Sequence, residues 1–547
     1  MKCLHEVAAS TSAAQTRWNG PASHRAVERT LANALLHVLL AAGPGMLKSP
    51  VPALRYPKMS IVQTTSGPIL GREKGGVFLF AGVPYAAPPV GRLRFRAPQP
   101  HSGWAEPLEA RKFGPAAPQV SSGGLTDPAP VRWSEDCLTL NIQTPALDDG
   151  RRPVLFWIHG GAYRTGQGAI PWYNGTSFCR HGDIVVVSIN YRLGALGFTD
   201  LSMLGSEFAS SGVNGTLDQI AALEWVRDNI DRLGGDPDKV TIAGESAGGF
   251  SVGTLLANPR CSGLFRGAIP QSGAGHHTLP ADCGRVVGEH FLRALNADTA
   301  LSLEAASVAD ILAAQGKVIA QLESSGGFVN RLGSTVSPFY PVHGNTFIPE
   351  MPIEAIDKGA GSTVAVLLGS NQDETTLWGY GKVDDAKLTR AVEGYGAERP
   401  LAAWRRAKPD ATAEALLIAL TTDHMFRVPA VRLAEARARH GAPTWMYLFA
   451  WRSRANEGKL GATHALEIPF AFNNLTQPGV QPFLGTGGDP QSVAELMHGA
   501  WIKFIRFGNP GWDDYDLARR ATFVFDDNSR LELDPGADIR SAWEGIR

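Results

Sequence analysis

Short runs of apolar residues, each about the length of a β-strand, recur along most of this chain. They span residues 154–158, 184–189, 240–243, 364–368 and 444–449. Apolar residues occupy consecutive rather than alternate positions in these runs, so both faces of each strand should be buried. This pattern is typical of a mainly parallel sheet with helices on both sides.

Helical patterns lie between the apolar runs. Residues 218–233 carry apolar side chains at helical spacing and stop at the turn Gly234-Gly235-Asp236-Pro237. Alternating strands and helices predict an α/β, doubly wound fold. The weakly periodic insert at residues 275–356 should not extend the sheet, and we expect it to form helices over the mouth of a pocket.

Composition and charge fit an ordinary globular protein. Of the 547 residues, 44% are hydrophobic and 19% are charged, and the net charge is −1. The absence of a long basic run argues against nucleic-acid binding. No apolar stretch approaches the ~20 residues of a membrane span. No linker or repeat divides residues 59–547, so we expect them to form a single domain.

Residues 1–58 differ from the rest of the chain and should form an N-terminal extension. The apolar stretch 31–42 resembles the core of a signal peptide, but about thirty residues before it is long for such a segment. The alternative is that translation starts at Met59 and that the extension is disordered or never made. We favour the alternative, and with it a cytoplasmic location. Secretion remains open if the extension contains a signal peptide.

The cysteines are odd in number and widely scattered. They are Cys3, Cys137, Cys179, Cys261 and Cys283, with no CxxC motif. This spacing argues against a metal cluster and against a dense disulfide framework. One bridge, between Cys261 and Cys283, remains open.

Residues 240–249, with the sequence VTIAGESAGG, place a serine between glycines directly after an apolar strand. In the spacing G-x-S-x-G, the serine lies on a tight turn that pushes its hydroxyl toward a substrate carbonyl. The motif alone is weak in a chain with 61 glycines. The helical pattern after Gly248 strengthens it, because a helix N-terminus would point at the developing negative charge. Ser246 is therefore the predicted nucleophile.

A serine hydroxyl needs a neighbouring base, and the base needs an acid that orients it. On a sheet of this type the chain order is serine, acid, histidine. The run at 364–368 leads to Asp373 and Glu374, and the residues alone do not choose between them. Of the 14 histidines, only His464 lies in the loop after the run at 444–449.

An oxyanion hole needs backbone N–H donors, one of them from the residue after the nucleophile. That residue is Ala247. A second glycine-rich turn, His159-Gly160-Gly161-Ala162, follows the run at 154–158. Its small residues would let the backbone approach the substrate oxygen closely, so we expect further donors from this turn.

Taken in order along the chain, these segments resemble the type-B carboxylesterase family, which contains carboxylesterases, para-nitrobenzyl esterases and cholinesterases. The resemblance covers nearly everything after Met59. Besides the segments already described, it rests on FAGVPYA at 80–86, SEDCLTLN at 134–141, NYRLG at 190–194, QSG at 271–273 and HALEIPF at 464–470.

The resemblance implies an α/β-hydrolase fold and a Ser-His-Glu triad. In the family's N-x-D-E run the catalytic acid is the glutamate, which makes Glu374 the expected acid and Asp373 the alternative. The family also implies oxyanion donors at Gly161, Ala162 and Ala247.

One departure from the family concerns Cys137. In many relatives this cysteine pairs with one in a G-P-x-C-P-Q segment, which here reads GPAAPQ at 114–119. Cys137 should therefore be a free, buried thiol, which favours a reducing compartment.

Together these observations predict a serine hydrolase that cleaves small carboxylic esters through an acyl-enzyme, with no metal or organic cofactor. Activity should rise with pH through an apparent pKa of ~6–7, because the histidine must be neutral. The same triad could instead act on amides, carbamates or thioesters, since the pocket reads the leaving group. A non-catalytic adhesion or binding protein is disfavoured because all three catalytic positions are filled. The oligomeric state is left open.

Overall fold

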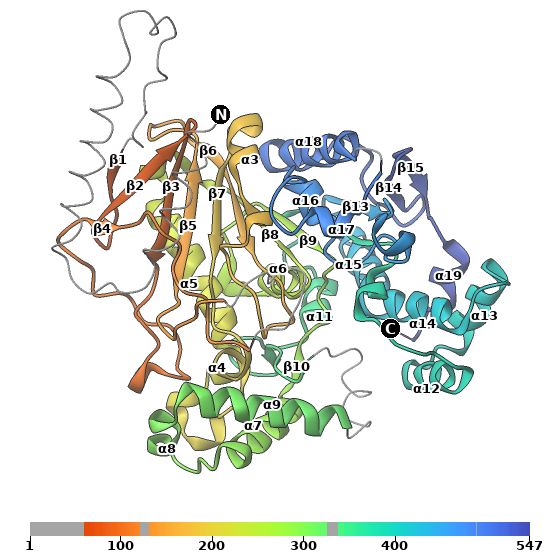
Figure 1. Cartoon of the computed structure of the whole chain (residues 1–547), viewed down its shortest axis with the longest axis horizontal. Helices are drawn as coiled ribbons and strands as arrows, with labels where there is room; N and C mark the ends of the chain where they lie inside the picture. The colour runs from red at the N-terminus through yellow and green to blue at the C-terminus, as the bar shows by residue number, and fades with distance from the viewer. Residues whose placement is uncertain (1–58, 121–130, 325–336, 488–489, 547) are drawn as a thin grey trace, which may run out of the picture. The chain divides into compact units, whose positions relative to one another are not determined.

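A thirteen-stranded β-sheet runs through the described part of the chain, residues 59–120, 131–324, 337–487 and 490–546 of a computed structural model (Figure 1). Its strands are β1 (Met59–Gln63), β2 (Pro68–Lys74), β3 (Val77–Pro84), β4 (Leu108–Glu109), β5 (Thr139–Thr144), β6 (Arg152–Ile158), β7 (Val185–Ile189), β8 (Gly235–Glu245), β9 (Gly267–Gln271), β12 (Ala365–Asn371), β13 (Thr444–Phe449), β14 (Ala521–Phe525) and β15 (Arg530–Leu533).

The sheet is parallel in its middle and antiparallel at its edges. The strands from β7 through β6, β8, β9, β12 and β13 to β14 run parallel to their neighbours. At one edge β1, β2, β3 and β5 are antiparallel, and at the other β15 is antiparallel to β14. Figure 1 shows these two edges in orange and in blue. The predicted mainly parallel sheet is confirmed, and the antiparallel edges were not predicted.

All five apolar runs form strands in the middle of the sheet, where β9, which was not predicted, lies between β8 and β12. The run at 444–449 coincides with β13. By contrast, β8 begins at Gly235, whereas the sequence predicts a strand only from Val240. The prediction was wrong here because the polar start of β8 is held by backbone pairing, with Arg152 opposite Gly235, rather than by apolar burial.

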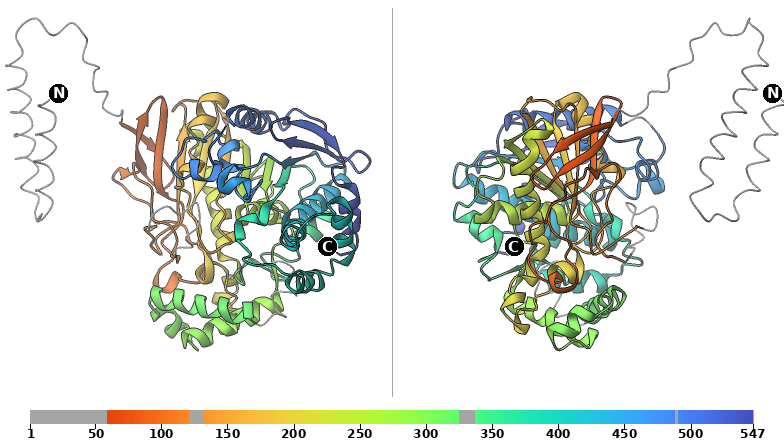
Figure 2. Two further views of the ribbon diagram at one scale, coloured as in Figure 1. Left: turned by 45° about the vertical axis from the view of Figure 1, so that its right-hand side comes forward. Right: turned by 90° about the vertical axis from the view of Figure 1, so that its left-hand side faces the viewer.

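Helices cover both faces of the sheet (Figure 2). On one face α5 and α6 pack on β8, and on the other α3 packs on β5 and β7 while α18 packs on β6 and β8. The predicted helix at 218–233 is α5 followed by a 3₁₀ turn, Ile230–Leu233. The helices are α3 (Thr176–Gly182), α4 (Gly194–Phe198), α5 (Asn214–Asn229), α6 (Ala247–Ala257), α7 (Ala281–Leu295), α8 (Ala300–Ala305), α9 (Val308–Ser324), α11 (Pro352–Asp357), α12 (Asp385–Tyr395), α13 (Glu398–Ala407), α14 (Ala413–Thr422), α15 (Val428–Ala438), α16 (Ile468–Ala471), α17 (Gln481–Leu484), α18 (Gln491–Phe507) and α19 (Ala537–Ala542).

The insert at 275–356 stays outside the main sheet, as predicted. It forms α7, α8, α9 and α11, and its two short strands β10 (Leu279–Pro280) and β11 (Val342–His343) pair only with each other. Its green helices α7 to α9 gather at one end of the sheet in all views (Figures 1 and 2). That they cover a pocket stays a prediction. The helices α12, α13 and α14 were not predicted.

The described residues include four of the five cysteines, and their helices test the expectation about membrane spans. Cys137 is a free, buried thiol, and burial raises its pKa well above the usual range. Cys261 is also a free, buried thiol, so it forms no bridge with Cys283. Within the described ranges, no helix combines the length and apolar character needed to span a bilayer. The interpretation of residues 1–58 lies outside the described residues.

Candidate active site

Ser246 lies on a sharp turn between β8 and α6. Its backbone has φ 57° and ψ −123°, a conformation that side chains rarely adopt. Ser246 is partly exposed, whereas Glu245 and Ala247 on either side of it are buried. The strand, strained turn and helix predicted around Ser246 are therefore present, and the turn presents this residue at the surface of the elbow.

The glycines of the elbow are required by close packing against β6. A Cβ atom on Gly248 would lie 2.1 Å from the carbonyl oxygen of Ile158, and one on Gly244 would lie 2.6 Å from the same oxygen. Real Cβ atoms do not approach a backbone oxygen so closely. The motif is thus a steric requirement of the fold at this point, which explains why two glycines flank the serine.

His464 and Glu374 form a buried hydrogen-bonded pair. His464 Nδ1 donates to Glu374 Oε2 at 2.6 Å, and the carboxylate is fully buried. Two more donors hold the other carboxylate oxygen: the Ser272 hydroxyl at 2.6 Å and the backbone N–H of Asn371 at 2.8 Å. The acid side chain is therefore fixed in one orientation toward the imidazole.

Asp373, the alternative acid, makes different contacts. Its Oδ2 accepts a hydrogen bond from the backbone N–H of Ala462 at 3.0 Å and one from the Arg452 guanidinium at 2.9 Å. Its own backbone N–H donates to the Ala462 carbonyl. Asp373 therefore holds the loop that carries His464, while Glu374 contacts the imidazole itself.

The other imidazole nitrogen lies beside a second carboxylate. His464 Nε2 is 3.1 Å from Glu245 Oε1, although the two atoms are not aligned as a hydrogen bond. Among the described residues, no hydrogen bond joins the Ser246 hydroxyl to His464. The structure thus brings together two of the three predicted catalytic side chains and places Glu245, the neighbour of the third, against the imidazole.

A third carboxylate completes a buried cluster around His464. Glu467 is fully buried and accepts hydrogen bonds from the Asn371 side chain at 2.6 Å and the Gln271 side chain at 3.2 Å. Sequence reasoning gave no role to Glu467, Glu245 or Ser272. Each belongs to a segment of the family resemblance, but their positions around Glu374 and His464 could be seen only in three dimensions.

The cluster shifts the pKa values of its members. Burial lowers the pKa of His464, but the carboxylates of Glu245 and Glu374 outweigh it and raise the pKa to about 9. Burial also raises the pKa of Glu245 and that of Glu467, because each carboxylate is removed from water beside others. The site therefore binds protons more tightly than the isolated side chains would.

The predicted oxyanion donors are available to a ligand. Within the described residues, the backbone N–H groups of Gly161 and Ala162 donate no hydrogen bond. Ala247 is the first residue of α6, where an N–H has no partner inside the helix. The turn at 161–162 is left-handed, with φ 112° and 54°. A Cβ on Gly161 would lie 2.2 Å from the carbonyl oxygen of Thr165, so only glycine fits there.

Two aromatic side chains flank the imidazole. The ring of Phe426 is 4.8 Å from that of His464, and the ring of Trp378 is 5.3 Å away. Phe426 comes from a π-helical turn, Asp423–Arg427, between α14 and α15. This turn was not predicted from the sequence. The two rings give the site apolar walls.

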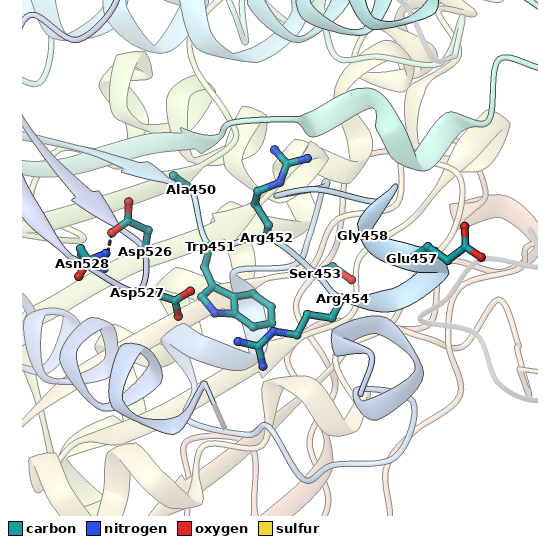
Figure 3. Close-up of a pocket in the computed structure, with 10 residues that line it drawn as sticks. All are labelled: Ala450, Trp451, Arg452, Ser453, Arg454, Glu457, Gly458, Asp526, Asp527 and Asn528. Atoms are coloured by element: carbon teal, nitrogen blue, oxygen red, sulfur yellow. Dashed lines mark hydrogen bonds between the residues drawn. The ribbon is translucent and has the colours of Figure 1, made fainter. Parts of the chain in front are cut away.

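A separate cavity of about 570 Å³ lies near the base of the His464 loop (Figure 3). Its lining includes Arg452, the partner of Asp373, and Trp451, whose ring lies 5.6 Å from the Arg454 guanidinium. None of the predicted catalytic residues lines it. Within the described ranges, no group of three or more His, Cys, Asp or Glu side chains is arranged to hold a metal ion.

Known proteins resemble this chain over most of its length. Residues 58–523 match the carboxylesterase family. The para-nitrobenzyl esterase of Bacillus subtilis is 37% identical over 492 residues, which cover 88% of this chain and 97% of that protein. The phenmedipham hydrolase of Pseudarthrobacter oxydans is 37% identical over 499 residues, covering 88% of this chain and 96% of that protein.

The structural comparison agrees. A crystal structure of a carboxylesterase from Geobacillus stearothermophilus superposes with a TM-score of 0.79 at 38% identity, covering 88% of this chain and 100% of that one. Sequence and architecture match over the same part of the chain. The chain therefore belongs to the carboxylesterase family, has the α/β-hydrolase fold and is a hydrolase of carboxylic esters.

Proposed function

We propose that this enzyme hydrolyses small carboxylic esters through an acyl-enzyme on Ser246, with His464 as general base and Glu374 as the acid that orients it. The observation that carries the proposal is the buried 2.6 Å hydrogen bond between His464 Nδ1 and Glu374 Oε2, beside a strained elbow that presents Ser246. The bond fixes the tautomer that leaves Nε2 able to accept a proton.

In the first half-reaction the Ser246 oxygen attacks the ester carbonyl carbon while His464 Nε2 accepts the hydroxyl proton. The tetrahedral intermediate collapses as the bond to the alkoxy oxygen breaks, and His464 returns the proton to the departing alcohol. In the second half-reaction His464 takes a proton from water, whose oxygen attacks the acyl-enzyme. The carboxylic acid leaves and Ser246 regains its proton.

The negative charge on the carbonyl oxygen in both half-reactions needs donors that are already in place. The N–H groups of Gly161, Ala162 and Ala247 are the proposed donors, and their freedom from other hydrogen bonds supports this role. Ala247 also begins α6, so the helix adds a favourable dipole at the same point. Removal of one such donor typically costs ~2.7–4 kcal/mol in the transition state.

Carbamates, amides and thioesters remain candidate substrates of the same machinery, because the leaving group is read by the pocket. The name of the Pseudarthrobacter relative indicates a substrate other than para-nitrobenzyl esters. Matched ester, amide, carbamate and thioester substrates should be compared by kcat/KM. A ratio that favours the ester supports the proposal, and a ratio that favours another class would replace it.

The nucleophile is tested with Ser246→Ala and the matched control Ser202→Ala, an exposed serine outside the elbow. We expect Ser246→Ala to lose both p-nitrophenyl acetate hydrolysis and labelling by a fluorophosphonate probe, while Ser202→Ala keeps both. Labelling of the Ser246→Ala protein at full yield would assign the nucleophile to another residue.

We further propose that residues 59–547 form one catalytic domain that does not need residues 1–58. A chain that begins at Met59 should fold and hydrolyse p-nitrophenyl acetate with the kcat/KM of the full chain. Loss of activity in soluble, folded protein of that length would contradict this.

A further inference from the structure

A cavity of about 260 Å³ lies on the antiparallel side of the sheet, against the face that α3 covers. Strand register builds its floor. Arg72 on β2 pairs with Leu79 on β3, Leu79 with Gln143 on β5, and Gln143 with Val186 on β7. Side chains two residues apart share a face, so flanking pairs extend this floor on either side. Lys74 pairs with Val77 on one side of the row, and Asn141 pairs with Ser188 on the other.

The charged groups that line this cavity are all positive. Arg72 and Lys74 line it, and no carboxylate is among its lining residues, all of which the structure describes. The Nε of Arg72 is buried and has no hydrogen-bond partner. The described residues form no ion pair with Arg72. A guanidinium with a buried, unused N–H normally has an anion beside it, because an unmet charged donor is costly.

The neutral polar side chains of the cavity form their hydrogen bonds with groups other than Arg72. The Gln143 side chain donates to Asn174 and Thr176 and accepts from the N–H of Gly175. Ser188 donates to the Gly168 carbonyl and accepts from Asn141. These bonds hold the loop that forms the roof, so they explain the polar floor without involving the cation.

The cavity in Figure 3 provides an internal contrast. Its lining includes Arg452 and Arg454, but also Glu457, Asp526 and Asp527. Positive and negative side chains are therefore present together there, and Arg452 already pairs with Asp373. The cavity at Arg72 is lined, among the described residues, by cations and by no carboxylate. Of these two cavities, only this one lacks a negative side chain to balance its positive charge.

The remaining walls are apolar. They are formed by Val77, Leu79, Phe113, Ile170, Pro171 and Tyr173. A bare inorganic anion would leave these surfaces unfilled, whereas an apolar body attached to the anion would cover them. The volume is slightly below the ~300–1,000 Å³ of sites for drug-sized ligands, which indicates a smaller occupant.

We propose that this cavity is a binding site, distinct from the Ser246 site, for a small organic monoanion: a carboxylate carried on a compact apolar body. The carboxylate accepts hydrogen bonds from the Arg72 guanidinium, with exposed Lys74 adding positive charge at the rim. The apolar body lies between the Leu79 side of the floor and the aromatic rings of Phe113 and Tyr173.

The test uses 4-fluorobenzoate as the probe and ¹⁹F NMR titration of the full-length enzyme. An acid can also bind near Ser246, so the titration can contain two binding phases. The phase assigned to the cavity is the one weakened in Arg72→Gln. A second variant, Leu79→Trp, fills the cavity without changing its charge. The matched control is Arg405→Gln, which removes an exposed arginine on α13. Retained hydrolysis of p-nitrophenyl acetate shows that each variant is folded.

We expect the Kd of this phase to rise by about tenfold or more in Arg72→Gln and Leu79→Trp, and to stay within about twofold in Arg405→Gln. Neutral 4-fluorobenzyl alcohol should bind about tenfold more weakly than the acid. Identical titrations of wild type and Arg72→Gln would overturn the proposal. So would equal binding of the alcohol, or inorganic phosphate binding as tightly as 4-fluorobenzoate, since an organic anion would then not be selected.

Discussion

The cluster around His464 and the cavity at Arg72 both hold unbalanced charge, but of opposite sign. Around the imidazole, three buried carboxylates, Glu245, Glu374 and Glu467, surround one titratable cation. In the cavity, Arg72 and Lys74 face a space with no carboxylate. Both regions lie on one sheet, within one catalytic chain.

The two regions relieve their charge in different ways. Carboxylates and imidazole exchange protons with water, so the cluster compensates by holding protons more tightly, as the raised pKa of His464 shows. A guanidinium stays protonated at any ordinary pH, so the cavity has no such adjustment. It can be balanced only by an anion from outside. Excess negative charge thus produces pH dependence, whereas excess positive charge on arginine produces ligand binding.

The largest expected effect comes from removing the carboxylate that orients the base. Glu374→Gln should lower kcat by about 10³–10⁴-fold, because an amide in this position can hold the imidazole in the wrong tautomer. Steady-state kinetics with p-nitrophenyl acetate measure it. The matched control is Asp373→Asn, which weakens the ion pair with half-exposed Arg452 and should cost about tenfold or less. A larger loss in the control would exchange the roles of the two acids.

These acids show how far sequence reasoning reached. Asp373 and Glu374 are adjacent, so chain position could not separate them, and the family resemblance favoured Glu374. In the structure the two side chains point in different directions after β12. Glu374 contacts His464, whereas Asp373 accepts a hydrogen bond from Ala462. Such directions depend on backbone angles after a strand, which apolar periodicity does not record.

The next largest effect concerns the loop that runs from the proposed oxyanion hole to the cavity at Arg72. Gly161, at one end, belongs to the proposed oxyanion hole, and Gly168, at the other, lines the cavity. In Gly161→Ala the new Cβ would collide with the Thr165 carbonyl at a φ of 112°, so kcat should fall by about 10²–10³-fold. If the regions are separate, 4-fluorobenzoate binding at the cavity should remain.

Gly396→Ala is the control for this substitution. Gly396 also has a positive φ, 63°, but a Cβ there meets nothing within 4 Å. It should cost about 1–2 kcal/mol of stability, measured by urea unfolding, because a Cβ strains the left-handed backbone, and it should leave kcat unchanged. Loss of 4-fluorobenzoate binding in Gly161→Ala but not in Gly396→Ala would show that the loop acts as one unit. The active site and the cavity would then not be separate.

The pH profile of kcat/KM tests whether the carboxylates around His464 raise its pKa. The base works only when neutral, so a His464 pKa raised to about 9 suppresses kcat/KM at neutral pH and lets it rise as the pH approaches that value. The sequence alone predicted a midpoint of ~6–7, because the contact with Glu245 was not foreseen. Glu245→Gln removes a charge that stabilises the imidazolium, so the midpoint should move down, toward the ordinary ~6.5. An unchanged midpoint would mean that Glu245 does not control the proton on His464.

The sequence predicted features that depend on neighbouring residues along the chain, and it missed features that depend on how distant strands pair. Apolar runs and glycine turns predicted β6, β7, β8, β12 and β13 because burial and sterics act locally. The antiparallel strands β1, β2 and β15 were missed because they are only partly buried. The buried strand β5 was missed because polar residues interrupt its apolar pattern. The cavity at Arg72 was missed for a related reason: its floor comes from four strands, and only their register brings the side chains together.

The smallest expected effect is the one that most sharply separates the two regions. Arg72 is not among the groups that shift the pKa of His464, and the Debye length of ~8 Å at physiological salt screens more distant charges. Arg72→Gln should therefore leave the midpoint of the kcat/KM profile where wild type has it, while Glu245→Gln moves it. The measurement is the pH profile of p-nitrophenyl acetate hydrolysis at low and physiological ionic strength. If Arg72→Gln moves the midpoint, and more so at low salt, the two regions share one electrostatic field. Proton binding at the cluster and anion binding at the cavity would then be coupled, because an anion on Arg72 would change the charge that His464 experiences.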